Sequence, residues 1–190
     1  LNFCTVDLSA FYFDIRKDSL YCDSIDSKNR KSTILLLNII LNSLLKWFAP
    51  ILSFTTEEIY RLIFKDSKSV HLEKFLNFPN NFENKKLYQK WLELIKIRNI
   101  CNISIEEQRA NKEIGSSLEA DLNIHLNKKL EEITKNIDFS ELCITSKAQI
   151  FFKEKLETSA QTTKAKGTKC TLCWKISENA CDRTHCPKNT

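Results

Sequence analysis

The sequence predicts a mainly α protein, in which a helical bundle is followed by a small α+β unit and a cysteine-rich C-terminal tail. Three observations lead to this fold class. Apolar residues recur every three or four positions over roughly the first 110 residues, as they do on the buried side of a helix. Apolar and polar residues then alternate strictly from Ala120 to Asn127. Finally, four cysteines lie close together near the end of the chain.

The first two helices of the bundle are predicted at about 2–16 and 30–48. A polar stretch that begins at Asp18 separates them. The second segment is hydrophobic almost all round, which is typical of a helix at the centre of a bundle. Its polar residues fall in one stripe at spacings of four, namely Asn38, Asn42 and Lys46.

Two further helices complete the predicted bundle. Thr55 and Glu58 have the spacing of a capping box, so we expect a third helix to begin there and to run to about Phe64. A long fourth helix is expected over 84–111, where apolar residues form one side among many charges.

The period of the pattern then changes. The alternation over 120–127 predicts a half-buried strand with His125 on its polar face, where we interpret it as a solvated side chain. A short helix over 128–136 and a second strand over 141–152 follow. Together they predict a strand–helix–strand unit.

Residues 153–168 are polar and rich in threonine and lysine, which favours a flexible linker. This interpretation divides the chain into four parts: a helical domain over 1–113, a junction unit over 114–152, the linker over 153–168 and the tail over 169–190.

The tail has the spacing of a metal site. Cys170 and Cys173 are separated by two residues, so their thiolates can reach one tetrahedral zinc ion, and Cys181 and Cys186 complete a four-cysteine set. His185 is an alternative to either of the last two. Two disulfides or free thiols are the other possibilities, but no secretory signal is visible and cytosolic thiols stay reduced, so we favour structural zinc.

Charge and composition exclude several function classes. The net charge is +5, and residues 161–190 hold 6 basic and 2 acidic groups, which favours a nucleic-acid partner for the tail. Only two glycines occur, which excludes a phosphate-binding glycine loop. The longest apolar stretch, 34–45, is too short to span a bilayer, so we expect no membrane partner.

Four segments carry a resemblance to a known family. They read NFCTVDLSAFYFDIRKDSLYCD at 2–23, WFAPILSFTTEEIY at 47–60, EQRANKEIGSSLEADL at 107–122 and KCTLCW at 169–174. In this order they resemble the C-terminal part of the bacterial isoleucyl-tRNA synthetases. The resemblance implies a helical anticodon-binding domain, a small junction domain and a zinc-binding end that assists tRNA binding.

The resemblance also implies what this chain should not do alone. The family ligates isoleucine to its tRNA with ATP and Mg²⁺, using a His-x-Gly-His motif and a Lys-Met-Ser-Lys-Ser loop, and neither motif occurs in this sequence. The chain lacks methionine and opens inside a helical segment, so we expect a piece of a larger cytoplasmic, monomeric enzyme whose catalytic half lies elsewhere in the same polypeptide. The family tail usually has a longer loop and a second two-residue gap, so it stays open whether Cys181 and Cys186 both bind the metal.

Unstacked anticodon bases are recognised by stacking and edge hydrogen bonds, while cations hold the phosphates. Trp174 either stacks on a base or covers the zinc site, and covering is favoured because a tail this small has few other apolar groups. Our candidate RNA contacts are Arg16, Lys17, Arg30, Lys31, Arg109 and Lys112, and for any single one of them an ordinary surface charge is the more common case.

Two rival interpretations remain. One is a free-standing helical adaptor whose zinc tail grips nucleic acid, and the other is a structural interaction domain with incidental zinc. The remaining cysteines, Cys4, Cys22, Cys101 and Cys143, are scattered along the sequence and are interpreted as small buried apolar residues.

Overall fold

The computed structural model describes residues 2–65, 68–154, 157–179 and 181. The chain forms two compact units. Unit 2 covers 25–83, whereas unit 1 combines 1–24 with 84–190. In sequence, unit 2 is therefore an insertion into unit 1. The predicted boundaries at 113, 152 and 168 follow motifs rather than compact units, and they stay predictions.

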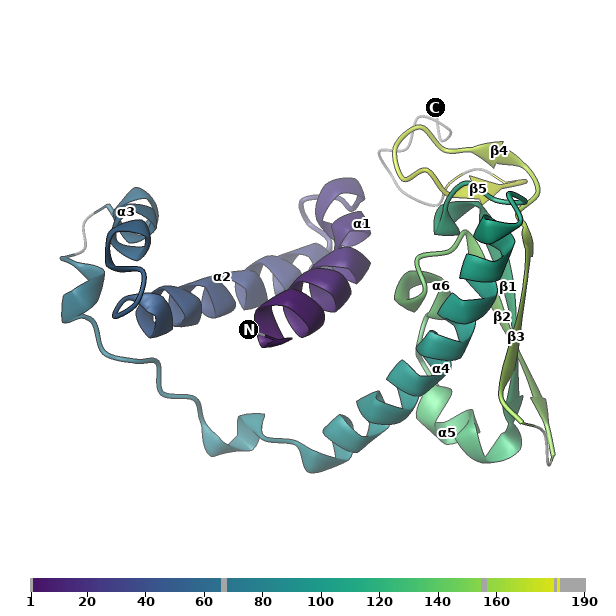
Figure 1. Ribbon diagram of the computed structural model, residues 1–190, viewed down its shortest axis with the longest axis horizontal. Coiled ribbons are helices and arrows are strands. Elements are labelled where there is room, and N and C mark those ends of the chain that lie inside the picture. Colours follow the sequence, from purple (N-terminus) through teal and green to yellow (C-terminus); the bar gives the residue numbers. More distant parts are fainter. Residues whose placement is uncertain (1, 66–67, 155–156, 180, 182–190) are drawn as a thin grey trace. The chain divides into compact units, whose positions relative to one another are not determined.

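Unit 2 consists of helices α2 (Lys28–Phe48) and α3 (Ser53–Ile63), with short 3-10 turns at Val70–Leu72 and Asn80–Phe82 (Figure 1). The side chain of Ser27 caps α2 by accepting a hydrogen bond from the Arg30 backbone amide at 3.5 Å. The small core of this unit contains Leu45, Ala49, Tyr60 and Val70.

Within unit 2, the side chains of Leu35 and Trp47 on α2 are exposed. The central position of α2 in a bundle with the helices of unit 1 stays a prediction. Lys46 is 7% exposed, and its ammonium lies 3.4 Å from a Glu73 carboxylate oxygen. A buried lysine needs such a partner, because desolvation of an unpaired charge is costly.

The capping box at Thr55 and Glu58 is wrong, because α3 begins two residues earlier, at Ser53. Glu57, the residue before Glu58, connects α3 to the turn that follows it. The Glu57 carboxylate accepts hydrogen bonds from the Arg61 guanidinium at 2.5 Å, the Ser69 hydroxyl at 2.8 Å and the Val70 amide at 2.9 Å. These bonds lower the pKa of Glu57 to about 2, and they fasten the turn after α3 to the helix.

Unit 1 begins with a π-helix, η1 (Phe3–Phe13), that continues directly into α1 (Asp14–Cys22). The predicted break at Asp18 is therefore wrong. The polar residues there are satisfied without ending the helix, since the buried Ser19 hydroxyl donates to the Asp23 carboxylate at 2.8 Å.

The long helix α4 (Lys85–Ala110) matches its prediction. Asn84 caps its start by accepting from the Leu87 amide at 2.9 Å. The ring of Phe11 in η1 meets Trp91 of α4 edge to face at 6.2 Å. The segment 2–22 therefore packs on α4.

The sheet of unit 1 has the strand order β2–β1–β3. The strands are β1 (Ala120–Asn127), β2 (Lys147–Lys153) and β3 (Ser159–Lys164). β1 pairs with β2 in parallel and with β3 antiparallel. The crossover from β1 to β2 contains a 3-10 turn at Lys128–Leu130 and the short helices α5 (Glu131–Thr134) and α6 (Phe139–Leu142).

The strand prediction for 120–127 is confirmed, and the apolar side chains of β1 are buried in one core with those of α4. The ribbon of α4 runs along this sheet (Figure 1). Two neighbouring predictions are wrong. The strand expected from Glu141 begins only at Lys147, because residues 139–142 form α6 on the Asp138 cap. The linker expected over 153–168 contains β3, whose buried Thr162 hydroxyl lies 2.9 Å from the Ser104 hydroxyl of α4.

No helix among the described residues is both long and apolar enough to cross a membrane.

Candidate functional site

A short hairpin presents the first cysteine pair. Strands β4 (Thr168–Lys169) and β5 (Ile176–Ser177) pair antiparallel, and the Cys170 amide donates to the Lys175 carbonyl at 2.8 Å across the turn. The Leu172 amide donates to the Cys170 sulfur at 3.4 Å. Backbone amides directed at sulfur stabilise a thiolate, so this turn is built for a metal ligand.

A glycine makes the hairpin possible. Gly167 has a φ of +119°, a region that disfavours every residue with a Cβ. A Cβ placed there would lie 2.2 Å from the backbone carbonyl of Ser177, on the opposite strand. Close approach of the two backbones at this point therefore requires glycine.

Three of the four predicted ligands come together. The sulfurs of Cys170, Cys173 and Cys181 all lie within 4.8 Å of one another, and the last two are 3.9 Å apart. Zinc–sulfur bonds of about 2.3 Å place the sulfurs of a tetrahedral site about 3.8 Å apart. The donor set and its spacing therefore fit zinc. Cys186 and His185 lie outside the described residues.

Burial governs the chemistry of these thiols. Desolvation raises the pKa of Cys173 to about 12, and its thiol neighbours add to the effect against an opposing backbone hydrogen bond at Lys175. Binding of a metal cation displaces the proton of such a thiol, which is the usual coupling of metal binding to deprotonation.

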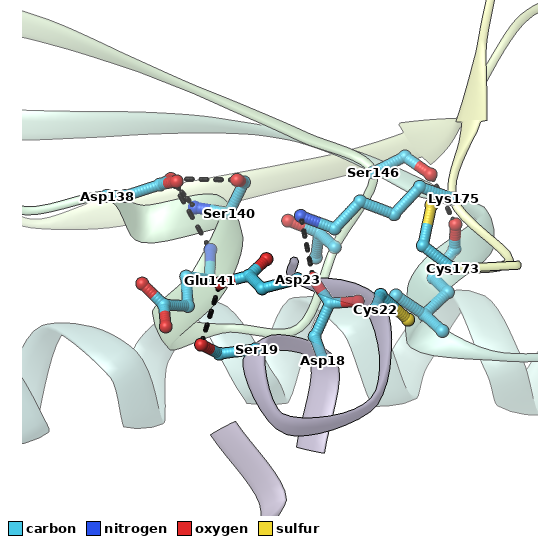
Figure 2. Close-up of polar contacts among 12 residues, drawn as sticks. Asp18, Ser19, Cys22, Asp23, Asp138, Ser140, Glu141, Ser146, Cys173 and Lys175 are labelled. Atoms are coloured by element: carbon cyan, nitrogen blue, oxygen red, sulfur yellow. Dashed lines mark hydrogen bonds and ion pairs between the residues drawn. The ribbon is translucent and has the colours of Figure 1, made fainter. Parts of the chain in front are cut away.

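The cysteine hairpin packs against other parts of unit 1 at several points. The Cys22 thiol of α1 donates to the Leu172 carbonyl at 3.6 Å, and the Lys175 ammonium lies 3.9 Å from the Asp18 carboxylate (Figure 2). The Ile176 amide donates to the Ser146 hydroxyl at 2.6 Å. These contacts hold the cysteine hairpin against α1 and the loop before β2.

Cys22 was missed as part of the site. The buried cluster around the metal-ligand thiols consists of Cys22, Cys170 and Cys173, with Leu172 and Cys181 packed on it. Trp174 is not in this cluster and is 60% exposed, so the expectation that its indole covers the cysteines is wrong. Cys22 and Leu172 do so instead. No spacing rule could have found Cys22, because it lies 150 positions from Leu172.

A largely apolar cavity of about 400 Å³ lies beside the cysteines, between α1, residues 140–144 and the hairpin. Trp174, Tyr21 and Lys17 line it, together with the carboxylates of Asp14 and Glu141. The volume falls in the range of small-ligand sites. Of the predicted RNA contacts, Lys17 and Trp174 thus meet at one cavity.

Most of the predicted basic contacts form ion pairs. Arg16 binds Glu141 at 2.6 Å, and Lys17 binds Asp14 at 2.8 Å, a hydrogen bond that raises the lysine pKa. In unit 2, Lys31 binds Asp26 at 2.9 Å, close to Arg30 near the start of α2.

The other two basic candidates lie at the C-terminal end of α4. Arg109 binds Glu106 at 2.7 Å, whereas Lys112 follows the helix with a φ of 60°. Both side chains line a shallow, open hollow together with Gly115. The described residues thus place the basic candidates in three separate groups, two in unit 1 and one in unit 2.

Comparison with known proteins decides the family. Residues 1–126 match the family described as the anticodon-binding domain of tRNA ligase. The chain belongs to this family. The anticodon-binding match includes η1, α1 to α4 and β1, and it stops before the cysteine hairpin.

Relatives of this anticodon-binding chain share one name. It is 64% identical over 183 residues to the isoleucine–tRNA ligase of Pelagibacter ubique, an alignment that covers 96% of this chain and 20% of the relative. It is 39% identical over 190 residues to the isoleucine–tRNA ligase of Bartonella henselae, covering 94% of this chain and 20% of the relative. The chain therefore spans about a fifth of the length of these relatives. The resemblance found in the sequence is confirmed.

Proposed function

We propose that the chain binds the anticodon region of isoleucine tRNA, as the tRNA-binding part of an isoleucine–tRNA ligase that works in the cytoplasm as a monomer. The observation that carries this proposal is the match of residues 1–126 to anticodon-binding domains, together with isoleucine–tRNA ligase relatives that align over nearly the whole chain. The catalytic half of the same polypeptide, with ATP and Mg²⁺, would supply the ligation chemistry.

The tail would contribute through a structural zinc ion. Cys170, Cys173 and Cys181 would hold it, with Cys186 or His185 as the fourth ligand. Bound zinc would fix the hairpin and thereby the lysines around it. The contacts from Lys175 to Asp18 and from Ile176 to Ser146 support this role, because they connect the hairpin to the body of unit 1.

Within this function, Lys17 and Trp174 are the most plausible pair of RNA contacts. They line the same cavity, and the exposed indole is free of the cysteine cluster. An indole stacks on any base, while an ammonium binds phosphate. Arg16, Arg30, Lys31, Arg109 and Lys112 remain proposed phosphate contacts, and of these Arg16, Lys31 and Arg109 would first exchange or share their carboxylate partners.

The test is tRNA binding by the purified chain. We expect tighter binding of isoleucine tRNA than of the same tRNA altered only in its anticodon. Equal affinity for the two would reduce the proposal to nonspecific RNA attachment, and absence of salt-dependent binding would refute it.

A second measurement addresses Lys17. Its replacement in Lys17→Gln should reduce the slope of log affinity against log salt by about one unit. Lys96→Gln is the matched control, because Lys96 is also an exposed helical lysine with a carboxylate partner three positions away. An unchanged slope in Lys17→Gln would remove this residue from the interface.

A further inference from the structure

The sheet of unit 1 has one covered face and one open face. Alternate residues of β1 are buried against α4, while the intervening ones lie on the other side and are only half-buried. On β2 and β3 the residues of this second side are exposed. The strand registers align these side chains into rows that cross the sheet.

One row contains a stacked pair of rings. His125 of β1 lies opposite Phe151 of β2, and their ring centroids are 5.3 Å apart with planes inclined by 24°. Phe151 is 42% exposed, and β2 forms an edge of the sheet. On the other side of His125 the register places the small Ser159. A third flat ring could therefore extend this two-ring stack with little steric obstruction.

The next row consists entirely of amides. Gln149, Asn123 and Gln161 lie opposite one another on β2, β1 and β3. Across the described part of the chain, their side chains make no hydrogen bonds. Each amide offers two donors and one acceptor oxygen, which is the combination that pairs with the edges of nucleobases.

Cations gather on the opposite side of the stacked pair. Asn127 lies opposite Lys153 in the following row, and the chain leaves β1 through Lys128 and Lys129. Asn127, these two lysines and Glu154 line one shallow hollow. Lys128 and Lys129 also line a neighbouring hollow with Glu131, Glu132 and Lys135, so this end of the sheet has four lysines against three carboxylates.

We propose that the open face of this sheet binds unpaired nucleotides of RNA, with one base stacked on Phe151, base edges on the amide row and phosphate near Lys128, Lys129 and Lys153. Flat aromatic groups on an exposed sheet, flanked by amides and cations, are what single-stranded RNA recognition requires. The inference rests on the proposed tRNA-binding function and adds a second surface to it, on the three-stranded sheet that precedes the cysteine hairpin in the chain.

A protein partner is the less suitable occupant. The centre of a stable protein interface is apolar and depleted of charged side chains. On this face the exposed aromatic ring of Phe151 is surrounded by amide and lysine side chains. Polar groups of this kind lose less solvation free energy when base edges and phosphates replace their water than when an apolar protein surface covers them.

Crosslinking tests the proposal on the complete chain. A ten-nucleotide unstructured RNA and isoleucine tRNA, each containing 4-thiouridine, are irradiated with the protein, and the attached peptides are identified by mass spectrometry. We expect crosslinks in 121–127 and 147–153. Binding is then measured for Phe151→Leu, which should weaken affinity for the unstructured RNA by about 5-fold to 150-fold, the range expected for loss of one base–aromatic stack.

Phe54→Leu is the matched control, because Phe54 is an exposed phenylalanine of unit 2. It should bind like the unaltered chain. Wild-type affinity in Phe151→Leu, or crosslinks confined to other segments, would overturn the inference while leaving anticodon-dependent tRNA binding intact. Protection of β2 from hydrogen exchange by the rest of a full-length ligase without RNA would assign the face to a protein contact and also overturn it. Failure of the unaltered chain to bind either RNA would refute both proposals.

Discussion

Replacing Gly167 by alanine should disable the cysteine hairpin. The added Cβ would lie 2.2 Å from both the carbon and the oxygen of the Ser177 carbonyl and 2.6 Å from the Glu178 amide nitrogen, at a φ of +119°. These contacts are with backbone, so no side-chain rotation relieves them. A residue held in such a backbone region costs of order 1–3 kcal/mol before the two strands are pushed apart.

The cost applies to the metal-bound state, because the tail needs its folded hairpin to bring the thiols together, whereas an unfolded tail is unstrained. Zinc affinity, measured by competition with a chromophoric chelator, should therefore fall roughly 5- to 150-fold in Gly167→Ala.

Gly115→Ala is the matched control, since the nearest atom to its added Cβ is a Glu119 carboxylate oxygen at 3.4 Å, the movable end of a side chain. It should leave zinc affinity unchanged. An affinity for zinc in Gly167→Ala equal to that of the unaltered chain would show that the hairpin does not present the ligands.

Three other perturbations have defined outcomes. Leu122→Ala removes a side chain that is 1% exposed in the core of unit 1, and it should lower the free energy of unfolding by about 2–5 kcal/mol in urea titrations. The control Leu62→Ala, at a site that is 70% exposed, should lower it by about 0.5 kcal/mol or less. The pKa of Glu57 is lowered to about 2 from a usual 4.5, so its stabilisation of unit 2 is complete above pH 4.5 and is lost as the pH falls toward 2. Glu57→Gln should flatten that part of the curve of unfolding free energy against pH. An unchanged curve would contradict the role given to the Glu57 carboxylate. Glu73→Ala leaves the 7% exposed ammonium of Lys46 without its carboxylate and should cost about 1–3 kcal/mol in the same titrations, less than a fully buried pair because Glu73 is partly solvated.

Helix caps and the periodicity of apolar residues were enough to predict helix α4 and strand β1. Helix α4 begins and ends where asparagines flank an amphipathic run, and the alternation over 120–127 corresponds to β1. Helix α1 was cut short because Asp18 and Ser19 look like a break, although Ser19 finds its partner one turn later, at Asp23.

Long-range pairing produced the errors. Residues 159–164 read SAQTTK, which has no apolar alternation, yet they form β3 because β1 offers a free edge and the Thr162 hydroxyl lies within hydrogen-bond distance of the Ser104 hydroxyl of α4. Small polar residues give no signal of burial when their partners lie far away in the sequence.

In the candidate site, too, the local spacing of residues could be predicted, whereas contacts between distant parts of the chain could not. The cysteine spacing predicted Cys170, Cys173, Cys181 and Cys186 as metal ligands, and the structure brings the first three together. Cys22 could not be predicted, because it contributes a packing surface rather than a ligand spacing. Trp174 was misjudged for a related reason: the apolar cover of the cysteines comes from α1, which the tail reaches only after folding.

The packing of α1 on the hairpin has a consequence during synthesis. The Cys22 thiol meets a carbonyl 150 positions later in the chain, so α1 leaves the ribosome well before its counterpart exists. At about 5–20 residues per second this delay is roughly 8–30 seconds, long enough for the inserted unit 2 to fold first. During that interval the side of α1 around Cys22 lacks its cover, although Phe11 can already pack on α4, and a ribosome-bound chaperone would shield that side.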